Sequence, residues 1–296
     1  MVIKNYSELI KRVKNRPPKT VIVVQADDVH ALEAIIHAAD MIKAVLVGNT
    51  AKIADILRLL GQNPADFDMV QVPEDEHPSV TAAGLVQAGK GDIIMKGNIK
   101  TGDLLKGILA EESGLRKSGQ MSHLAIMEIP NYHKLVFLTD CGMCLNPDLE
   151  QKKQILLNTI QFMHLLGYEH CKAAALCSVE DLNPKMPETN DASELKRKSL
   201  LNELPGCYVE GPISYDLAMS SESARIKEFA CSCPGDFDIL LAPNMLTGNI
   251  LGKCLVYSAG SKMAGLVLGA RVPIVVTSRS STAEEKYNSI AVAASI

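Results

Sequence analysis

Residues 20–25 have the sequence TVIVVQ, a short run rich in β-branched side chains that predicts a buried strand. A helical pattern follows over about residues 28–41, and the next apolar run is AVLVG at residues 44–48. Asn49 and Thr50 come directly after this run and predict the cap of a further helix. A strand, a helix and a second strand in this order indicate an α/β unit with parallel strands.

The same alternation continues to the end of the chain. Further strands are predicted at residues 92–95, 135–139, 173–177, 239–242 and 274–277. Because these apolar runs are continuous rather than alternating, helices should cover both faces of the sheets. The predicted fold class is therefore α/β, with mostly parallel sheets covered by helices.

The composition excludes several classes of protein. Hydrophobic residues make up 47% of the 296 residues and charged residues 22%, which is typical of globular proteins. The formal net charge is −4, and the excess of acidic residues argues against a general nucleic-acid binder. No apolar run approaches the roughly 18 residues that a membrane-spanning helix needs, so no membrane association is expected.

The N-terminal segment and the Cys residues predict a cytoplasmic protein. Residues 1–15 are polar and amphipathic, without the apolar core of a signal peptide, so the eight Cys residues are expected to be reduced thiols. Cys141 and Cys144 have the C-x-x-C spacing of a zinc or redox site, but no second C-x-x-C accompanies them. We expect no metal site, and a non-enzymatic metal or redox protein that uses these two thiols is an alternative from a different class.

Polar residues gather at the ends of five predicted strands, where open parallel sheets bind ligands. Taken singly, such residues also suit turns and helix caps. Together they supply cations, hydroxyl groups and amides, the mixture that phosphate groups require. The candidate substrate-binding residues of this anion pocket are Lys96, Thr101, Lys106, Asp140, Ser178, Lys185, Asn244, Gly248, Asn249 and Lys253.

The last of these strand ends carries the most specific signal. Ser278 and Arg279 follow the strand predicted at residues 274–277, and residues 280–282 are expected to begin a helix. The positive end of that helix and its N–H groups would favour an anion beside them. Glu284 and Glu285 allow two interpretations, because each lies three residues after a hydroxyl residue that would complete a capping box. A catalytic role and a capping role are both open for these two carboxylates.

The chain resembles the phosphate acetyl/butyryl transferase family over nearly its whole length, from about Val21 onward. The NPKMP run and the short N-terminal half are more similar to the butyryl branch than to the acetyl branch. The resemblance is densest at residues 95–97 with 114–116, 137–140 (FLTD), 183–187 (NPKMP), 240–257, and 270–279 with 288–290.

The resemblance implies two α/β domains of the isocitrate/isopropylmalate dehydrogenase type, with the active cleft between them. The first domain would comprise residues 1–113 and 269–296. The second, residues 114–268, would form the homodimer contact. The implied reaction is acyl-CoA plus phosphate to acyl phosphate plus CoA and its reverse, with butyryl-CoA expected and an acetyl or other short-chain substrate as the alternative. Coenzyme A is then a substrate, and neither a tightly bound cofactor nor a covalent acyl-enzyme is expected.

The resemblance also implies roles for residues after the last strand. Ser278 and Arg279 match the family's Ser-Arg pair, so Arg279 would hold phosphate and Ser278 would donate a hydrogen bond to the transition state or the sulfur. Glu285 lies six residues after this Arg, where the acetyl branch has an Asp that acts as base toward the CoA thiol. Glu284 is the adjacent candidate for that base. Lys106 matches a second family Arg. A Lys supplies the positive charge but not the bidentate hydrogen bonds that an Arg forms with phosphate.

Two further alternatives follow from the same sequence. The fold also hosts NAD-linked decarboxylating dehydrogenases, which need clustered Asp residues for a divalent metal. No Asp-x-x-x-Asp pair accompanies Asp140 and Asp148. A relative with altered activity is the other alternative, because Cys144 and Gly252 depart from the usual butyryl-branch residues. Candidate contacts of the acyl group are Met143, Cys144 and Met186.

Overall fold

The computed structural model describes residues 2–117, 119–278 and 280–296. The chain divides into two compact units. We call Ser7–Ser118 with Ala264–Ile296 the terminal unit, and Met1–Tyr6 with Gly119–Met263 the central unit. The two domains implied by the family resemblance stay a prediction.

The terminal unit is built on parallel strands in the order β3-β2-β1-β4-β11, and β10 runs antiparallel to β11. Because β2 and β4 lie on opposite sides of β1, the direction of winding reverses between β1 and β4, where parallel sheets tend to bind ligands. The strands are β1 (Lys19–Val24), β2 (Ile42–Gly48), β3 (Asp68–Gln71), β4 (Ile93–Lys96), β10 (Lys262–Leu268) and β11 (Ile274–Val275).

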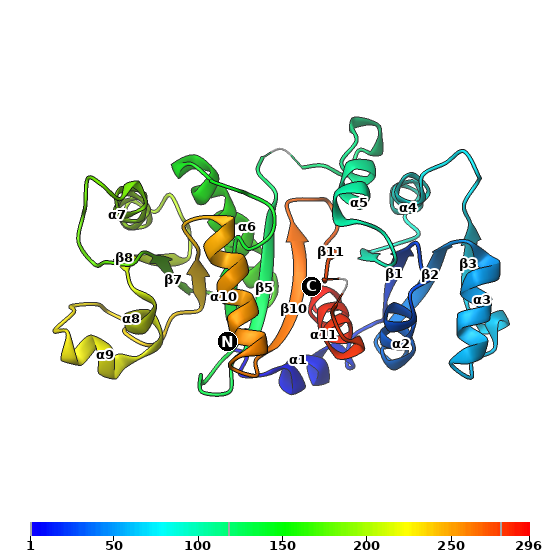
Figure 1. The fold of residues 1–296 in the computed structure, drawn as a ribbon, viewed down its shortest axis with the longest axis horizontal. Coiled ribbons are helices and arrows are strands. Elements are labelled where there is room, and N and C mark those ends of the chain that lie inside the picture. Colours follow the sequence, from blue (N-terminus) through cyan, green and yellow to red (C-terminus); the bar gives the residue numbers. More distant parts are fainter. Residues whose placement is uncertain (1, 118, 279) are drawn as a thin grey trace. The chain divides into compact units, whose positions relative to one another are not determined.

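Helices cover both faces of this sheet (Figure 1). One face carries α2 (Val29–His37), α3 (Thr50–Leu59) and α11 (Ala283–Ala294), and the other carries α4 (Pro78–Gln87) and α5 (Thr101–Ile108). The remaining helical segments are α1 (Tyr6–Val13), η1 (Pro64–Asp66) and η2 (Glu111–Ser113). Side-chain caps mark the starts of α2, α3, α4 and α11, and the predicted cap Asn49 of α3 accepts a hydrogen bond from the Lys52 N–H at 3.1 Å.

The turn after β4 requires a glycine. A Cβ atom on Gly97 would lie 2.2 Å from the carbonyl oxygen of Gln25, which no real side chain tolerates. The backbone N–H of Asn98 donates to that same oxygen at 2.7 Å. The end of β4 is therefore held directly against the end of β1 by backbone contact.

The central unit has the strand order β5-β6-β9-β7-β8, in which only the pair β5–β6 is antiparallel among the described pairings. Helices α8, α9 and α10 pack on one face, where Phe237, Leu240 and Leu255 belong to a single buried core. Helices α6 and α7 contact each other and the sheet. The elements are β5 (Ser122–Glu128), β6 (Val136–Thr139), α6 (Leu149–Leu165), β7 (Cys171–Leu176), α7 (Pro187–Leu200), β8 (Cys207–Ile213), α8 (Tyr215–Met219), α9 (Ser221–Ile226), β9 (Ile239–Leu241) and α10 (Met245–Tyr257).

Ion pairs of the buried Lys134 join the N-terminal ends of three central strands. Lys134 precedes β6, and its Nζ lies 2.6 Å from Oδ1 of Asp238, which precedes β9, and 2.7 Å from Oδ1 of Asp236. The other oxygen of Asp238 accepts a hydrogen bond from the backbone N–H of Lys172 in β7 at 2.9 Å. Because the side chains of Lys134 and Asp238 are only 3% and 4% exposed, loss of either partner would leave a buried charge uncompensated.

The predicted fold class is confirmed: the strands are mostly parallel and helices cover them. The strand predicted at residues 274–277 is shorter than expected, because β11 ends at Val275. The strands β3, β5, β8 and β10 were not predicted. Within the described residues, no helix combines the length and the apolarity needed to span a bilayer.

Candidate active site

The C-terminal edge of the terminal sheet carries one group of predicted residues. Lys96 is the last residue of β4 and is 3% exposed, and its Nζ donates to the carbonyl oxygen of Gly97 at 3.4 Å. Thr101 begins α5, and Lys106 is exposed in the last turn of that helix. These residues therefore place one buried and one exposed cation on the segment that begins at the end of β4.

The turn between β11 and α11 presents hydroxyl groups. Ser278 and Ser280 are both exposed, and their Oγ atoms lie 3.0 Å apart. The backbone N–H of Ser281 donates to the carbonyl oxygen of Ser278 at 3.1 Å, which closes the turn. Arg279, the predicted phosphate ligand, lies outside the described residues. Two hydroxyl groups thus stand close before the N-terminus of α11, as an anion site of this kind needs.

Helix α11 begins at Ala283, after the start predicted at residues 280–282, because Thr282 is its N-cap. Thr282 Oγ1 accepts from the Glu285 N–H at 3.2 Å, and Glu285 Oε2 accepts from the Thr282 N–H at 3.2 Å. The alternative box of Ser281 with Glu284 is not formed, since the buried Ser281 hydroxyl has no partner among the described residues. Glu285 therefore has a capping role through Oε2, and Glu284 is exposed.

Behind this turn lies a buried cation that the sequence alone does not single out. Lys286 is 1% exposed, and its Nζ lies 3.3 Å from Thr277 Oγ1 and 3.9 Å from Asp28 Oδ2. Burial lowers the pKa of the Lys286 ammonium, and the nearby carboxylates of Asp28 and Glu285 oppose this shift only in part. The sequence feature that could have indicated its burial is spacing. Lys286 precedes the apolar Ile290 by four residues and so lies on the same inward face of the helix.

A second group of predicted residues lies in the central unit, around the turn after β6. A Cβ atom on Gly248 would lie 2.3 Å from the carbonyl oxygen of Asp140, so α10 packs directly on this turn. Asn249 Nδ2 donates to the carbonyl oxygen of Cys141 at 3.1 Å. The buried Asp140 carboxylate accepts three backbone hydrogen bonds, each of 2.7 Å, from the N–H groups of His123, Gly142 and Met143. Asp140, Gly248 and Asn249 therefore all have structural contacts.

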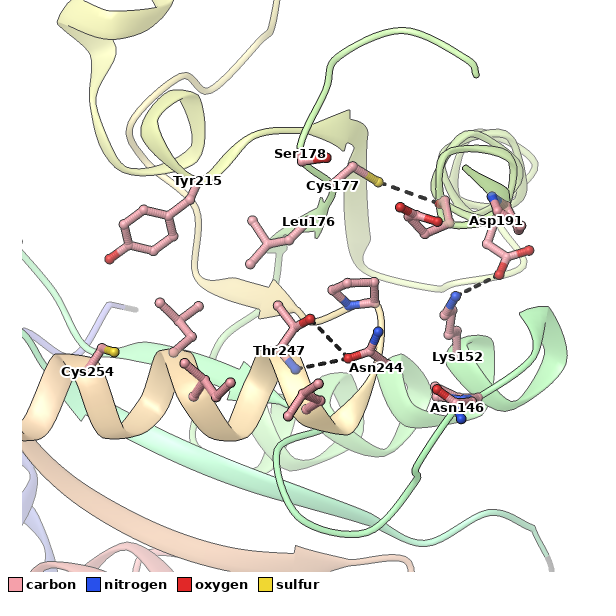
Figure 2. A pocket seen from close by; sticks show the side chains of 17 residues that line it. Asn146, Lys152, Leu176, Cys177, Ser178, Asp191, Tyr215, Asn244, Thr247 and Cys254 are labelled. Carbon is pink, nitrogen blue, oxygen red and sulfur yellow. Dashed lines mark hydrogen bonds and ion pairs between the residues drawn. The ribbon is translucent and has the colours of Figure 1, made fainter. Parts of the chain in front are cut away.

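A pocket of about 900 Å³ opens beyond the C-terminal ends of β7 and β9 (Figure 2). Among the predicted residues, Ser178 and Asn244 line it. Asn244 also caps α10, because its Oδ1 accepts from the Thr247 N–H at 2.9 Å. On the same side of the pocket as Asn244, Lys152 and Asp191 form an ion pair of 2.6 Å (Figure 2). The walls are mainly apolar and include Leu176, Tyr215, Leu246, Ile250 and Leu251.

The remaining predicted residues of the central unit do not line this pocket. Lys185 and Lys253 are exposed and do not line the pocket. The candidate acyl contacts Met143, Cys144 and Met186 do not line it either. The structure thus brings Ser178 and Asn244 together and leaves these five residues apart from that pocket.

The thiols of Cys141 and Cys144 are both buried. Burial raises the pKa of both, that of Cys144 to about 12, which disfavours the reactive thiolate form. Cys141 Sγ lies 2.9 Å from His123 Nδ1. No group of three or more His, Cys, Asp or Glu residues able to hold a metal ion occurs in the described part of the chain. This environment lends no support to the metal or redox alternative.

Known proteins match the chain over nearly its whole length. The family model described as "Phosphate acetyl/butaryl transferase" matches residues 52–294. The phosphate butyryltransferase of Clostridium acetobutylicum is 39% identical over 295 residues, covering 99% of this chain and 98% of that protein. The phosphate acetyltransferase of Rhizobium meliloti is 34% identical, with 98% and 92% covered.

A solved structure matches as well. The branched-chain phosphotransacylase from Enterococcus faecalis V583 has a TM-score of 0.82 and 30% identity, with 93% of this chain and 97% of that chain covered. The family match and these identities agree with the α/β fold described above. The chain therefore belongs to the phosphate acetyl/butyryl transferase family, and it is a phosphate acyltransferase that interconverts acyl-CoA plus phosphate with acyl phosphate plus CoA.

Proposed function

We propose that the preferred acyl group is butyryl, which makes the chain a phosphate butyryltransferase. The observation that carries this proposal is the 39% identity to the phosphate butyryltransferase of Clostridium acetobutylicum over 99% of the chain. The phosphate acetyltransferase of Rhizobium meliloti is less similar, at 34%. The NPKMP run at residues 183–187 supports the same branch.

The purified chain is expected to release CoA from butyryl-CoA in the presence of phosphate, with a kcat/KM at least about tenfold above that for acetyl-CoA. Two additional methylene groups in a fitting pocket supply this difference, since each contributes about 1–3 kcal/mol. Thiol release is followed with a thiol-reactive dye, and reactions without phosphate serve as the control. A higher kcat/KM for acetyl-CoA would replace butyryl by acetyl and leave the family's reaction intact.

We assign direct transfer between the two substrates. In the direction of CoA acylation, the thiolate attacks the carbonyl carbon of the acyl phosphate, a C–S bond forms, and the C–O bond to phosphate breaks. The thiol of CoA has an ordinary pKa near about 8.5, so a base must take its proton at neutral pH. Glu285 or Glu284 would supply that base.

Charge stabilisation in this scheme comes from the turn between β11 and α11. Arg279 would hold the phosphate and neutralise its developing charge, and Ser278 would donate a hydrogen bond to the transition state or the sulfur. The exposed hydroxyl of Ser278 beside the N-terminus of α11 supports this role. Lys96, Thr101 and Lys106 would contact phosphate or CoA from the segment after β4. Contacts with CoA from the central unit would come from Asp140, Ser178, Lys185, Asn244, Gly248, Asn249 and Lys253.

We further propose that the protein is a homodimer formed through α10 of the central unit. Leu246, Ile250 and Tyr257 expose 67%, 53% and 74% of their surfaces. Their spacing of four and seven residues places them on one side of the helix. A contiguous exposed apolar stripe is typical of a protein–protein interface. The wall of the 900 Å³ pocket continues this stripe, because Leu246 and Ile250 also line it.

Ile250→Glu is expected to convert the dimer into a monomer, since it places a charge in the centre of the apolar stripe. Analytical ultracentrifugation at several protein concentrations measures this change. Leu59→Glu is the matched control, because Leu59 is 84% exposed on α3 of the terminal unit and the variant should sediment like the unmodified protein. An unmodified protein that sediments as a monomer, or an Ile250→Glu variant that remains dimeric, would contradict the α10 interface.

A further inference from the structure

Lys286 is a buried cation whose partners satisfy it poorly. An ammonium group has three N–H donors, and its burial is costly unless it is paired and hydrogen-bonded. Among the described residues, its hydrogen-bond partner is Thr277 Oγ1 at 3.3 Å, and the Asp28 carboxylate lies 3.9 Å away. Such an arrangement persists only when other interactions of the fold compensate for its cost, so the presence of Lys286 here calls for a functional reason.

The two partners of Lys286 belong to separate elements. Thr277 follows β11 and immediately precedes Ser278. Asp28 is the N-cap of α2, with its Oδ1 accepting from the Ala31 N–H at 2.8 Å. Lys286 itself lies in the first turns of α11, which packs on α2, β4 and β11. The ammonium thus links the end of β11 to the starts of two helices.

The charged groups at this edge define how Lys286 titrates. The carboxylates of Asp28, the N-cap of α2, and of Glu285 in α11 both favour the charged ammonium. At the same edge, Asp27 follows β1 with a buried Oδ1 that has no partner among the described residues, and Lys96 ends β4. Burial outweighs the two carboxylates and lowers the pKa of Lys286 from its usual 10.5.

We propose that Lys286 is a positioning residue for acyl transfer, which holds the end of β11 through Thr277 and Asp28 so that Ser278 keeps the geometry of the phosphate-binding turn. The inference rests on the role proposed above for Ser278. Lys286 does not contact substrate in this arrangement. Its effect reaches the reaction through Thr277, the residue next to Ser278.

The pH dependence has a definite sign. Because the pKa of Lys286 is lowered, its charged form is present below that pKa and is lost as the pH rises through it. The kcat for butyryl-CoA plus phosphate should therefore fall on the alkaline side, in the direction of the reaction where no CoA thiol has to ionise. This fall is the alkaline limb of the pH profile of kcat. If Lys286 had only a structural role, its replacement would leave the alkaline limb unchanged.

Lys286→Met is the central variant, because Met keeps the unbranched shape and most of the length of the side chain and removes its charge. We expect kcat to fall at least about tenfold, as for the loss of a group that orients the reacting atoms, with KM for butyryl-CoA unchanged. The alkaline limb of the unmodified protein should be absent from the variant. Lys52→Met is the matched control, because Lys52 is exposed on α3 and loses the same charge.

Thr277→Val tests the hydrogen bond between Lys286 and Thr277. It also provides a second variant if circular dichroism shows that Lys286→Met does not fold. We expect Thr277→Val to lower kcat, and the double variant to lose no more than Lys286→Met alone, since the two act as one unit. A normal kcat in Thr277→Val, or an unchanged alkaline limb in Lys286→Met, would overturn the proposal.

Ser278→Ala distinguishes the proposed role of Ser278 from the inferred role of Lys286. Full activity in this variant contradicts the role of Ser278, whereas its loss beside a fully active Lys286→Met contradicts only the inference.

Discussion

Arg279→Ala is expected to lower kcat/KM for phosphate at least about tenfold, because a guanidinium that grips phosphate through two hydrogen bonds stabilises the charge that develops in the transition state. Arg279→Lys should recover only part of the activity, since an ammonium keeps the charge without the two-pronged geometry. The measurement is phosphate-dependent release of CoA from butyryl-CoA at several phosphate concentrations.

Arg58→Ala is the matched control for loss of one guanidinium. Arg58 lies on α3 of the terminal unit, where its Nη1 forms an exposed ion pair of 2.7 Å with Asp55. This variant should retain the activity of the unmodified protein, because exposed pairs contribute little to stability. Equal activity of Arg279→Ala and Arg58→Ala would exclude Arg279 as the phosphate ligand.

Glu285→Gln is expected to reduce kcat/KM for CoA in the acyl phosphate direction about 10²- to 10⁴-fold at pH 7, the range that a general base contributes. The capping box makes this substitution informative. A Gln side chain still accepts a hydrogen bond from the Thr282 N–H, so the cap of α11 is kept while the basic group is lost. Activity should recover in part at higher pH, where the CoA thiol ionises without assistance.

Glu284→Gln is the matched control from the same helical turn, because Glu284 takes no part in the capping box. Both variants are assayed with butyryl phosphate and CoA, and helix content is compared by circular dichroism. A larger loss in Glu284→Gln would move the base to Glu284. Small, equal losses in both variants would leave Glu285 with its capping role alone.

Continuous apolar runs made most of the buried strands predictable, because their composition differs sharply from that of the flanking turns. Two of the four missed strands, β3 and β8, lack this contrast. Strand β3 (DMVQ) lies at the end of its sheet and is only partly buried. Strand β8 contains Gly211 and Pro212, which in a sequence indicate a turn, yet at the edge of a sheet a proline is tolerated.

The candidate site was predictable at the level of strand ends, but not at the level of individual contacts. Sequence spacing allowed two capping boxes, and only the observed start of α11 at Ala283 selects the one with Thr282 and Glu285. Lys286 was not predictable as part of the site, because Asp28 lies far from it in the chain and the fold alone brings the two together. The place of Asp140 after a strand was predictable, but its three backbone hydrogen bonds depend on a turn geometry that no spacing rule encodes.

The ion pair between Lys134 and Asp238 bears on how this enzyme can diversify. It anchors β6, β7 and β9 at their N-terminal ends, and the loops that contain Ser178 and Asn244 leave β7 and β9 at the opposite ends. Substitutions in those loops therefore leave the anchor untouched. A library of variants for laboratory evolution can therefore randomise the loops after these strands while Lys134 and Asp238 stay unchanged, so that the scaffold of each variant remains intact.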